Sequence, residues 1–141
     1  MKIKSILALV LSADLLSFLI SCSRGGSGQD NTVGVKADDP DMVAAIDQAR
    51  SRLAKFWRVF EHPEHGESDL CLKVKVSDGD QVEHFWVAGI EWKEGKIRGT
   101  ISNEPEFVRT VKLGQRIWMS ETDISNWMYT RDGKMHGNHT M

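Results

Sequence analysis

The spacing of apolar residues predicts one long amphipathic helix at the start of the folded part of the chain. Apolar residues follow one another there at intervals of four and three positions: Met42, Ile46, Ala49, Leu53, Phe56 and Phe60. This spacing places them on one stripe of a helix. Asp39 is a typical N-cap residue and Pro40 suits the first helical position, whereas His62-Pro63 is typical of a helix end. We therefore expect a helix that begins at Pro40, ends near His62 and packs its stripe on a sheet.

Downstream of this helix, apolar residues recur at every second position, which is typical of strands. The clearest alternation covers residues 70–76, and further strands are expected over residues 82–92, 97–102, 116–119 and 127–131. Residues 120–125 predict a short polar turn or a single helical turn, and residues 134–140 close the chain. A helix followed by a meander of strands indicates an α+β fold. We expect one long N-terminal amphipathic helix packed on a mainly antiparallel, strongly twisted sheet of about five strands.

The first residues of the chain resemble a bacterial lipoprotein signal peptide. Lys2 and Lys4 precede an apolar stretch over residues 6–20, and the run Leu19-Ile20-Ser21-Cys22 ends it. A basic start, an apolar middle and small residues before a cleavage site are typical of an export signal. The resemblance implies that the peptide is cut before Cys22 and that lipid, including palmitate, is added to the Cys22 thiol and to the new amino terminus. Because Ser23 follows, the resemblance favours the outer membrane over the inner one.

Two other interpretations of this segment stay open, namely an uncleaved anchor and ordinary secretion. A transmembrane helix needs about 20 mostly apolar residues. The apolar stretch here is shorter and contains Asp14 near its middle, where a carboxylate costs about 2.5–3.5 kcal/mol on insertion scales. We therefore expect a cleaved signal peptide at residues 1–21, a flexible tether at residues 22–39 and a single α+β domain at residues 40–141. The tether has too few large apolar groups to fold.

Composition narrows the classes of partner. The chain has 141 residues, 18 Lys and Arg against 20 Asp and Glu, and a formal net charge of −2. Because there is no basic excess, nucleic acid is not an expected partner. Two cysteines are present, so lipid on Cys22 leaves Cys71 as the remaining one. We therefore expect no internal disulfide and interpret Cys71 as a small strand residue, with a reactive thiol as the alternative.

Several short runs, taken together, resemble the YegJ-like family of bacterial domains of unknown function. The runs cover residues 83–87, Gly99 with residues 103–105, and residues 111–114, 124–129 and 137–140, and the resemblance extends from about residue 44 to the end of the chain. Asn126 and His139 stand where the family pattern usually has Asp and Tyr. The resemblance implies a shared fold and brings no established activity.

The candidates for catalysis and metal binding are few. Glu83 and His84 are adjacent on an expected strand, so their side chains point to opposite faces and cannot form a directly bonded pair. His84 is the candidate general base of a hydrolase-like enzyme, supported by Glu83 or Asn103 if the fold brings them close. His62 and His65 have the spacing of two metal ligands, but they lie on an expected loop. The structural interpretation of these residues is the simpler one, and no cofactor is expected.

Four tryptophans on the expected strands are candidates for a binding surface: Trp86, Trp92, Trp118 and Trp127. Exposed Trp is enriched at interface hot spots, and packing of all four in the core is the alternative. Our first hypothesis is a non-enzymatic, lipid-anchored module facing the periplasm that binds another envelope protein or a cell-wall glycan. The alternatives are a small hydrolase-like or metal-dependent enzyme that uses His84, and an immunity-type protein that neutralises a toxin.

Overall fold

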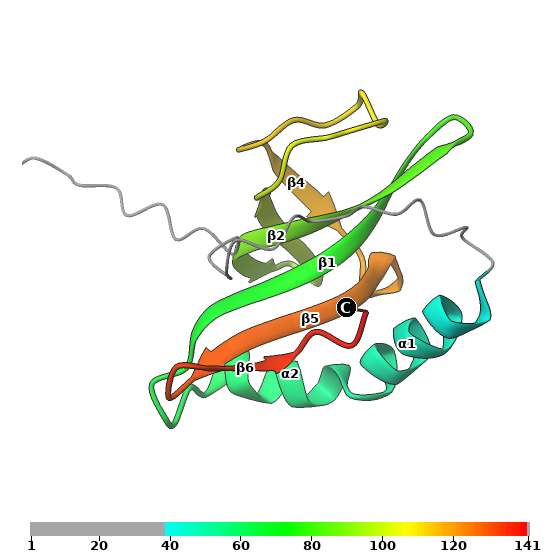
Figure 1. The fold of residues 1–141 in the computed structure, drawn as a ribbon. Helices are drawn as coiled ribbons and strands as arrows, with labels where there is room; N and C mark the ends of the chain where they lie inside the picture. Colours follow the sequence, from blue (N-terminus) through cyan, green and yellow to red (C-terminus); the bar gives the residue numbers. More distant parts are fainter. Residues whose placement is uncertain (1–38, 141) are drawn as a thin grey trace, which may run out of the picture.

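The computed structural model describes residues 39–140, in which two N-terminal helices pack on a six-stranded antiparallel sheet (Figure 1). The elements in chain order are α1 (Pro40–Ser51), α2 (Leu53–Glu61), β1 (Ser68–Asp78), β2 (Gln81–Lys93), β3 (Lys96–Ile101), β4 (Arg116–Met119), the 3-10 turn η1 (Glu121–Asp123), β5 (Ile124–Arg131) and β6 (Lys134–Gly137). The strand order is β4-β3-β2-β1-β5-β6. The predicted α+β class is therefore confirmed, and no helix among the described residues is long and apolar enough to cross a membrane.

The start of the first helix is the one that the sequence predicts. The Asp39 carboxylate accepts hydrogen bonds from the backbone amides of Asp41 (2.9 Å) and Met42 (3.2 Å). Pro40 occupies the first helical position, where its missing N–H costs no hydrogen bond. These contacts confirm Asp39 as the predicted N-cap of α1.

The single long helix that the sequence predicts is wrong, because the helix breaks at Arg52. The indole Nε1 of Trp127 donates to the Ala49 carbonyl at 2.8 Å. In a continuous helix this carbonyl would accept from the amide of Leu53, but here the Arg52 amide bonds it at 3.2 Å. The apolar stripe nevertheless continues across the break, since Ala49, Leu53 and Phe56 are all buried.

The sheet has six strands rather than about five, because residues 134–137 form an edge strand. β6 pairs with β5 from Met128 opposite Gly137 to Arg131 opposite Lys134. β5 also begins at Ile124, earlier than predicted. The register of β1 and β5 shifts there, so that Lys73 lies opposite Asn126 and Val74 lies opposite Ile124. Because the residues at this β-bulge are polar, the start of β5 does not show the alternation of apolar positions that predicts a strand.

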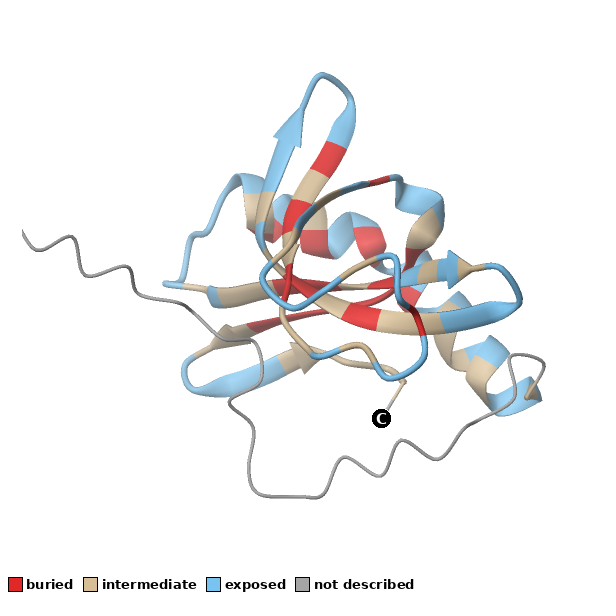
Figure 2. Cartoon of the chain, turned by 90° about the horizontal axis from the view of Figure 1, so that it is seen from above, coloured by how far each residue is buried: buried red, intermediate tan, exposed pale blue. Residues whose placement is uncertain are grey.

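The core lies between the helices and the inner face of the sheet (Figure 2). It is built from the central strands and from the buried stripe of the helices: Ala49, Leu53, Phe56, Val59, Leu72, Val74, Phe85, Val87, Ile97, Ile101, Val108, Met119, Ile124, Trp127 and Tyr129. Val108 comes from the long connection between β3 and β4, which therefore closes part of the core. The β2–β3 hairpin, the end of β4 and the start of η1 carry the site described next.

Candidate binding site

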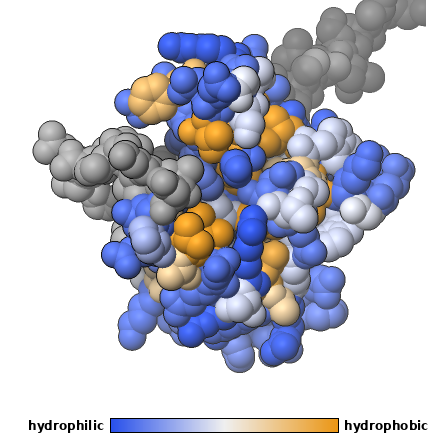
Figure 3. All heavy atoms as spheres, turned by 90° about the vertical axis from the view of Figure 1, so that its right-hand side faces the viewer, coloured by the Kyte–Doolittle hydropathy of each residue, from blue (hydrophilic) through white to orange (hydrophobic). Residues whose placement is uncertain are grey.

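Large apolar side chains are exposed at several separate places on the described surface. They are Val43, Val82, Trp92, Phe107, Leu113, Trp118 and Met135. The face shown in Figure 3 accordingly carries small apolar patches separated by polar side chains rather than one continuous apolar field. Trp92 and Trp118 each line a hollow in the described surface, and the cavity beside Trp92 is our candidate binding site.

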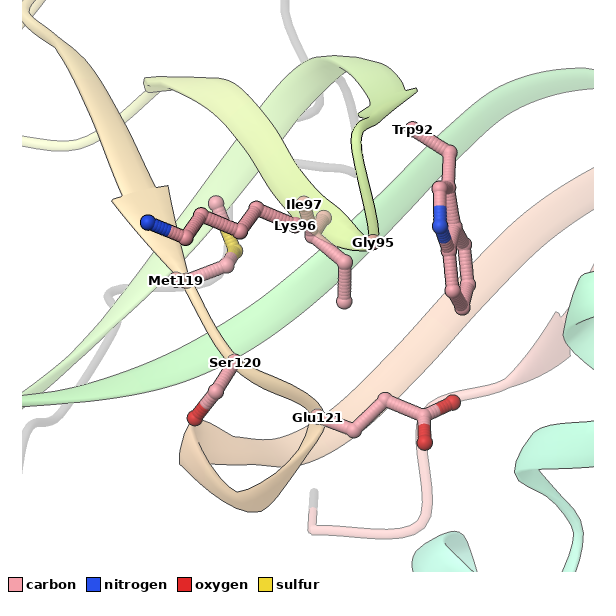
Figure 4. A pocket seen from close by; sticks show the side chains of 7 residues that line it. All are labelled: Trp92, Gly95, Lys96, Ile97, Met119, Ser120 and Glu121. Carbon is pink, nitrogen blue, oxygen red and sulfur yellow. The ribbon is translucent and has the colours of Figure 1, made fainter.

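The cavity lies where the β2–β3 hairpin meets the end of β4, and its volume is about 260 Å³ (Figure 4). Its lining residues are Trp92, Gly95, Lys96, Ile97, Met119, Ser120 and Glu121. Glu94 and Gly95 both have positive φ, as a two-residue type I′ hairpin turn requires. This tight turn sets Trp92 directly opposite Ile97.

The cavity has an apolar floor and two chemically different walls. Ile97 and Met119 form the floor and are almost fully buried. Trp92, which is 48% exposed, forms one wall, and the carboxylate of Glu121 lies across from it (Figure 4). The site therefore offers an aromatic face and a hydrogen-bond acceptor within a single shallow depression.

Helix α2 fixes the orientation of both walls through Trp57. The Trp57 indole Nε1 donates to Glu121 Oε1 at 2.7 Å. Its ring packs edge-on against Trp92, with 4.8 Å between the ring centroids and an interplanar angle of 75°. Neither Trp57 nor Glu121 is identified as a site residue from the sequence. Trp57 lies within the predicted helix, and no local pattern marks Glu121 as its partner 64 positions away.

The other three predicted tryptophans lie in different surroundings. Trp118 is exposed on β4 with the Arg98 guanidinium over its ring at 5.4 Å. Trp86 is half-buried, and the Lys73 ammonium lies 5.3 Å from its ring centroid. Trp127 is buried in the core, where its ring cannot face a partner. Exposed tryptophan is thus present on β2 and β4 but not on β5.

His84 is paired with a buried serine rather than placed in a cavity. Its Nδ1 lies 2.7 Å from the hydroxyl of Ser125, which in turn lies 3.2 Å from the Lys73 carbonyl. Burial lowers the pKa of His84 from its ordinary value, and the nearby charges of Lys73, Lys75 and Arg50 lower it further. His84 is therefore neutral at pH 7. Ser125 is 3% exposed, so its hydroxyl has little access to a substrate.

Glu83 anchors the connection between β3 and β4. Its carboxylate accepts hydrogen bonds from three consecutive backbone amides, those of Glu106 (2.9 Å), Phe107 (3.1 Å) and Val108 (3.2 Å). The neighbouring Asp78 carboxylate accepts from the Arg109 amide at 2.8 Å. These bonds occupy the carboxylate that the sequence offers as a partner for His84.

Asn103, the amide offered as a partner of His84, and Asn126, which departs from the family pattern, hold the backbone and the tail of the chain. Asn103 Oδ1 accepts from the Trp86 amide at 2.8 Å. Asn126 is fully buried, and its Oδ1 accepts from the His139 amide at 3.1 Å while its Nδ2 donates to the Thr140 hydroxyl at 2.7 Å. The two runs at residues 124–129 and 137–140 that carry the family resemblance therefore meet in space. None of these amides lines the cavity beside Trp92.

The remaining predicted positions lie away from this cavity. His62 and His65 are both exposed on the loop between α2 and β1, and no three His, Cys, Asp or Glu side chains within residues 39–140 converge as metal ligands. Cys71 is buried on β1 and is disulfide-bonded, so the expectation of no disulfide at this residue is wrong. Cys22 lies outside the described residues.

Comparisons with known proteins give a family model and two relatives. The model, described as "Uncharacterized protein conserved in bacteria (DUF2314)", matches residues 39–141. The uncharacterized protein YegJ of Escherichia coli (strain K12) is 32% identical over 128 residues, which cover 90% of this chain and 82% of that protein. A putative ankyrin repeat protein of Neisseria meningitidis serogroup B is 32% identical over 114 residues, which cover 75% of this chain and 45% of that protein. No solved structure matches the chain.

Proposed function

The chain belongs to the DUF2314 family of bacterial proteins, as its resemblance to the YegJ-like family predicts, and we propose that it is a lipid-anchored glycan-binding module of the cell envelope. The observation that carries the binding part is the cavity between Trp92 and Glu121. The non-enzymatic part is supported by the side chains of Glu83, Asn103 and Asn126. Each of them already accepts a hydrogen bond from a backbone amide and so has a structural role.

The anchoring part rests on the run that ends at Cys22. Attached acyl chains add about 0.8 kcal/mol per buried CH₂, and two or more together hold a protein stably on a membrane. The sequence has two cysteines, so an internal disulfide at Cys71 and a lipid thioether at Cys22 compete for one thiol. When Cys22 carries lipid, the disulfide at Cys71 needs a thiol from outside the chain.

Mass spectrometry of the protein purified from native membranes tests the anchoring. We expect an amino-terminal peptide that begins at Cys22 and carries the mass of acyl chains, and we expect Cys22→Ala to lack this lipid. A retained starting methionine, or a peptide in which Cys22 is cross-linked to Cys71, would contradict the proposal. Fractionation of the two membranes then tests the expected outer-membrane position.

Glycan is the ligand that the cavity favours. The C–H groups on the face of a sugar ring pack on an indole, and sugar hydroxyls donate to a carboxylate such as Glu121. The volume of about 260 Å³ is below the roughly 300–1,000 Å³ of pockets that enclose whole drug-sized ligands. The cavity therefore suits one ring of a longer chain, which continues across the open surface.

Binding of purified peptidoglycan sacculi and of chitotetraose to the full chain tests this assignment. Trp92→Ala removes the aromatic wall, and Trp118→Ala is the matched control because its indole is similarly exposed, 51% against 48%. We expect Trp92→Ala to weaken binding by at least about tenfold, the usual loss at a hot spot, and Trp118→Ala to leave it unchanged. Equal binding by both variants, or equal loss in both, would remove the cavity from consideration as the glycan site.

A further inference from the structure

β4 forms one edge of the sheet, and half of its backbone groups point away from the neighbouring strand. β4 pairs with β3 alone, from Ile97 opposite Met119 to Thr100 opposite Arg116. The Ile101 amide donates to the Gln115 carbonyl at 2.9 Å, and hydrogen-bonded pairs alternate along an antiparallel ladder. It follows that Arg116 and Trp118 direct their N–H and C=O groups outward, where no backbone partner is found for them within residues 39–140.

A groove of about 260 Å³ lies along this edge. Its lining residues come from β1, from the β3–β4 connection, from β4 and from η1: Val74, Lys75, Val76, Ser77, Val111, Ile117, Trp118, Met119 and Asp123. β5 pairs with β1 no further than Val74. The following residues of β1 therefore pair with β2 alone, and the groove runs between two strand edges.

The part of the groove that the side chains of an added strand would contact is apolar. Val76, Val111 and Ile117 are half-buried and pack on the outer part of the core from three different segments. In an extended peptide every second side chain points to the same face. A strand paired with β4 would thus place alternate side chains against these three residues.

We propose that the outer edge of β4 accepts an extended segment of another protein, with alternating apolar and acidic residues, as an added strand. Strand addition uses the free backbone groups for affinity and the groove for specificity. The groove shares Met119 with the cavity beside Trp92 but has an otherwise different lining, and the proposal does not depend on the proposed glycan binding.

Charge selects an acidic partner over a second copy of this chain. Lys75 and Asp123 line the groove, and the Arg98 guanidinium lies over the ring of Trp118 at its edge. The nearby Asp123 carboxylate accepts hydrogen bonds from Ser120. Arg116 is paired with Glu91 at 2.9 Å, so these two charges offset each other. The remaining basic excess repels an identical edge and attracts carboxylates.

Fluorescence polarisation with two labelled eight-residue peptides tests the proposal on the full chain. One peptide alternates glutamate with valine, and the other alternates lysine with valine. We expect the glutamate peptide to bind saturably and the lysine peptide to bind at least about tenfold more weakly, because the charge pattern opposes it. Absence of binding, or equal binding of the two peptides, overturns the proposal.

A pair of variants at Arg116 isolates the backbone contribution. Proline is tolerated at the first residue of an edge strand but cannot donate a hydrogen bond, so Arg116→Pro removes the outward N–H. Arg116→Ala removes the same side chain and keeps that N–H. We expect Arg116→Pro to bind the glutamate peptide at least about tenfold more weakly than Arg116→Ala. The reason is that proline removes one backbone hydrogen bond to the added strand and disturbs the strand geometry around it. Equal affinities overturn the proposal.

Two measurements on the unmodified protein keep the test independent of how Arg116→Pro folds. The glutamate peptide should slow hydrogen exchange of the Arg116 and Trp118 amides, whereas those of Ile117 and Met119 are already bonded to β3. Unchanged exchange at Arg116 and Trp118 contradicts strand addition. Sedimentation that shows a dimer held through this edge identifies a second copy as the occupant and overturns the choice of an acidic partner.

Discussion

Among single residues, Glu83 shows how a catalytic candidate in a sequence can be a structural anchor. Its carboxylate holds three consecutive amides of the β3–β4 connection, and that connection supplies the fully buried Val108. A carboxylate on a strand looks the same in the sequence whether it binds substrate or backbone. The contact from Glu83 to Val108 spans 25 positions, so local pattern cannot reveal it.

Removal of this carboxylate should destabilise the domain. We expect Glu83→Ala to lower the free energy of unfolding by about 2–3 kcal/mol, because hydrogen bonds to a charged group contribute about 1.5–3 kcal/mol and the amides lose their acceptor. Urea denaturation measures the change. Glu104→Ala, at an exposed carboxylate of the same connection, is the control and should leave the midpoint unchanged. Equal stability of both variants would show that the anchor contributes little.

His84 should make stability depend on pH as the pH falls through its ordinary pKa of 6.5 and below. Its pKa is lowered in the folded protein, first by burial, so the unfolded chain binds more protons than the folded one below the ordinary value of 6.5. Stability therefore falls as pH decreases through this range. We expect a smaller fall in His84→Gln, measured by urea midpoints at each pH. The same slope in both proteins would exclude His84 as its source.

Glu67 should act in the same direction at lower pH. Its side chain is 1% exposed and pairs with Arg131, with Oε1 within 2.6 Å of the guanidinium. A backbone hydrogen bond from His65, followed by the contacts with Arg131, lowers its pKa from 4.5 to about 2. Its contribution to stability is complete above pH 4.5 and is lost as pH falls toward 2. Glu67→Gln should flatten this part of the pH profile, whereas an unaltered profile would contradict the assignment.

Among the secondary-structure elements, α1 and β5 are coupled by hydrogen bonds in both directions, from Arg50 Nε to the Ile124 carbonyl and from the Trp127 indole to Ala49. Trp127 takes the Ala49 carbonyl at 2.8 Å and thereby separates α1 from α2. The apolar stripe continues across this break, because Ala49 on one side and Leu53 and Phe56 on the other are all buried. The break depends on a side chain 78 positions away, which explains why helical periodicity alone predicts a single helix.

Trp127→Phe tests this coupling. The substitution keeps an aromatic ring in the core but removes the indole N–H and leaves unfilled volume. We expect the free energy of unfolding to fall by about 2–3 kcal/mol, and we expect hydrogen exchange to show the Leu53 amide newly protected by the Ala49 carbonyl. Trp118→Phe, on the exposed face of β4, is the control and should have little effect on unfolding. An unprotected Leu53 amide in Trp127→Phe would separate the break from the indole bond.

For the molecule as a whole, the sequence predicts the fold class, the positions of most strands and the start of the first helix well, because each of these depends on a local pattern. Asp39, Pro40 and the alternation around Val74 lie within a few residues of the features that they predict. The site is predicted less completely. Trp92 is identified by its type, but its partners Trp57 and Glu121 come from other elements. Burial decides which tryptophan can bind, and burial depends on the tertiary fold.

The position of β5 has a consequence for how the chain acquires its structure. The strand lies between β1 and β6 in the sheet, and it also supplies Trp127 to the helices, yet it begins at Ile124, near the carboxyl end. A chain that is synthesised amino terminus first must therefore deliver β5 before the core can close. Until Trp127 is available, the apolar stripe of the helices lacks its partner on β5 and the core of the described residues stays incomplete.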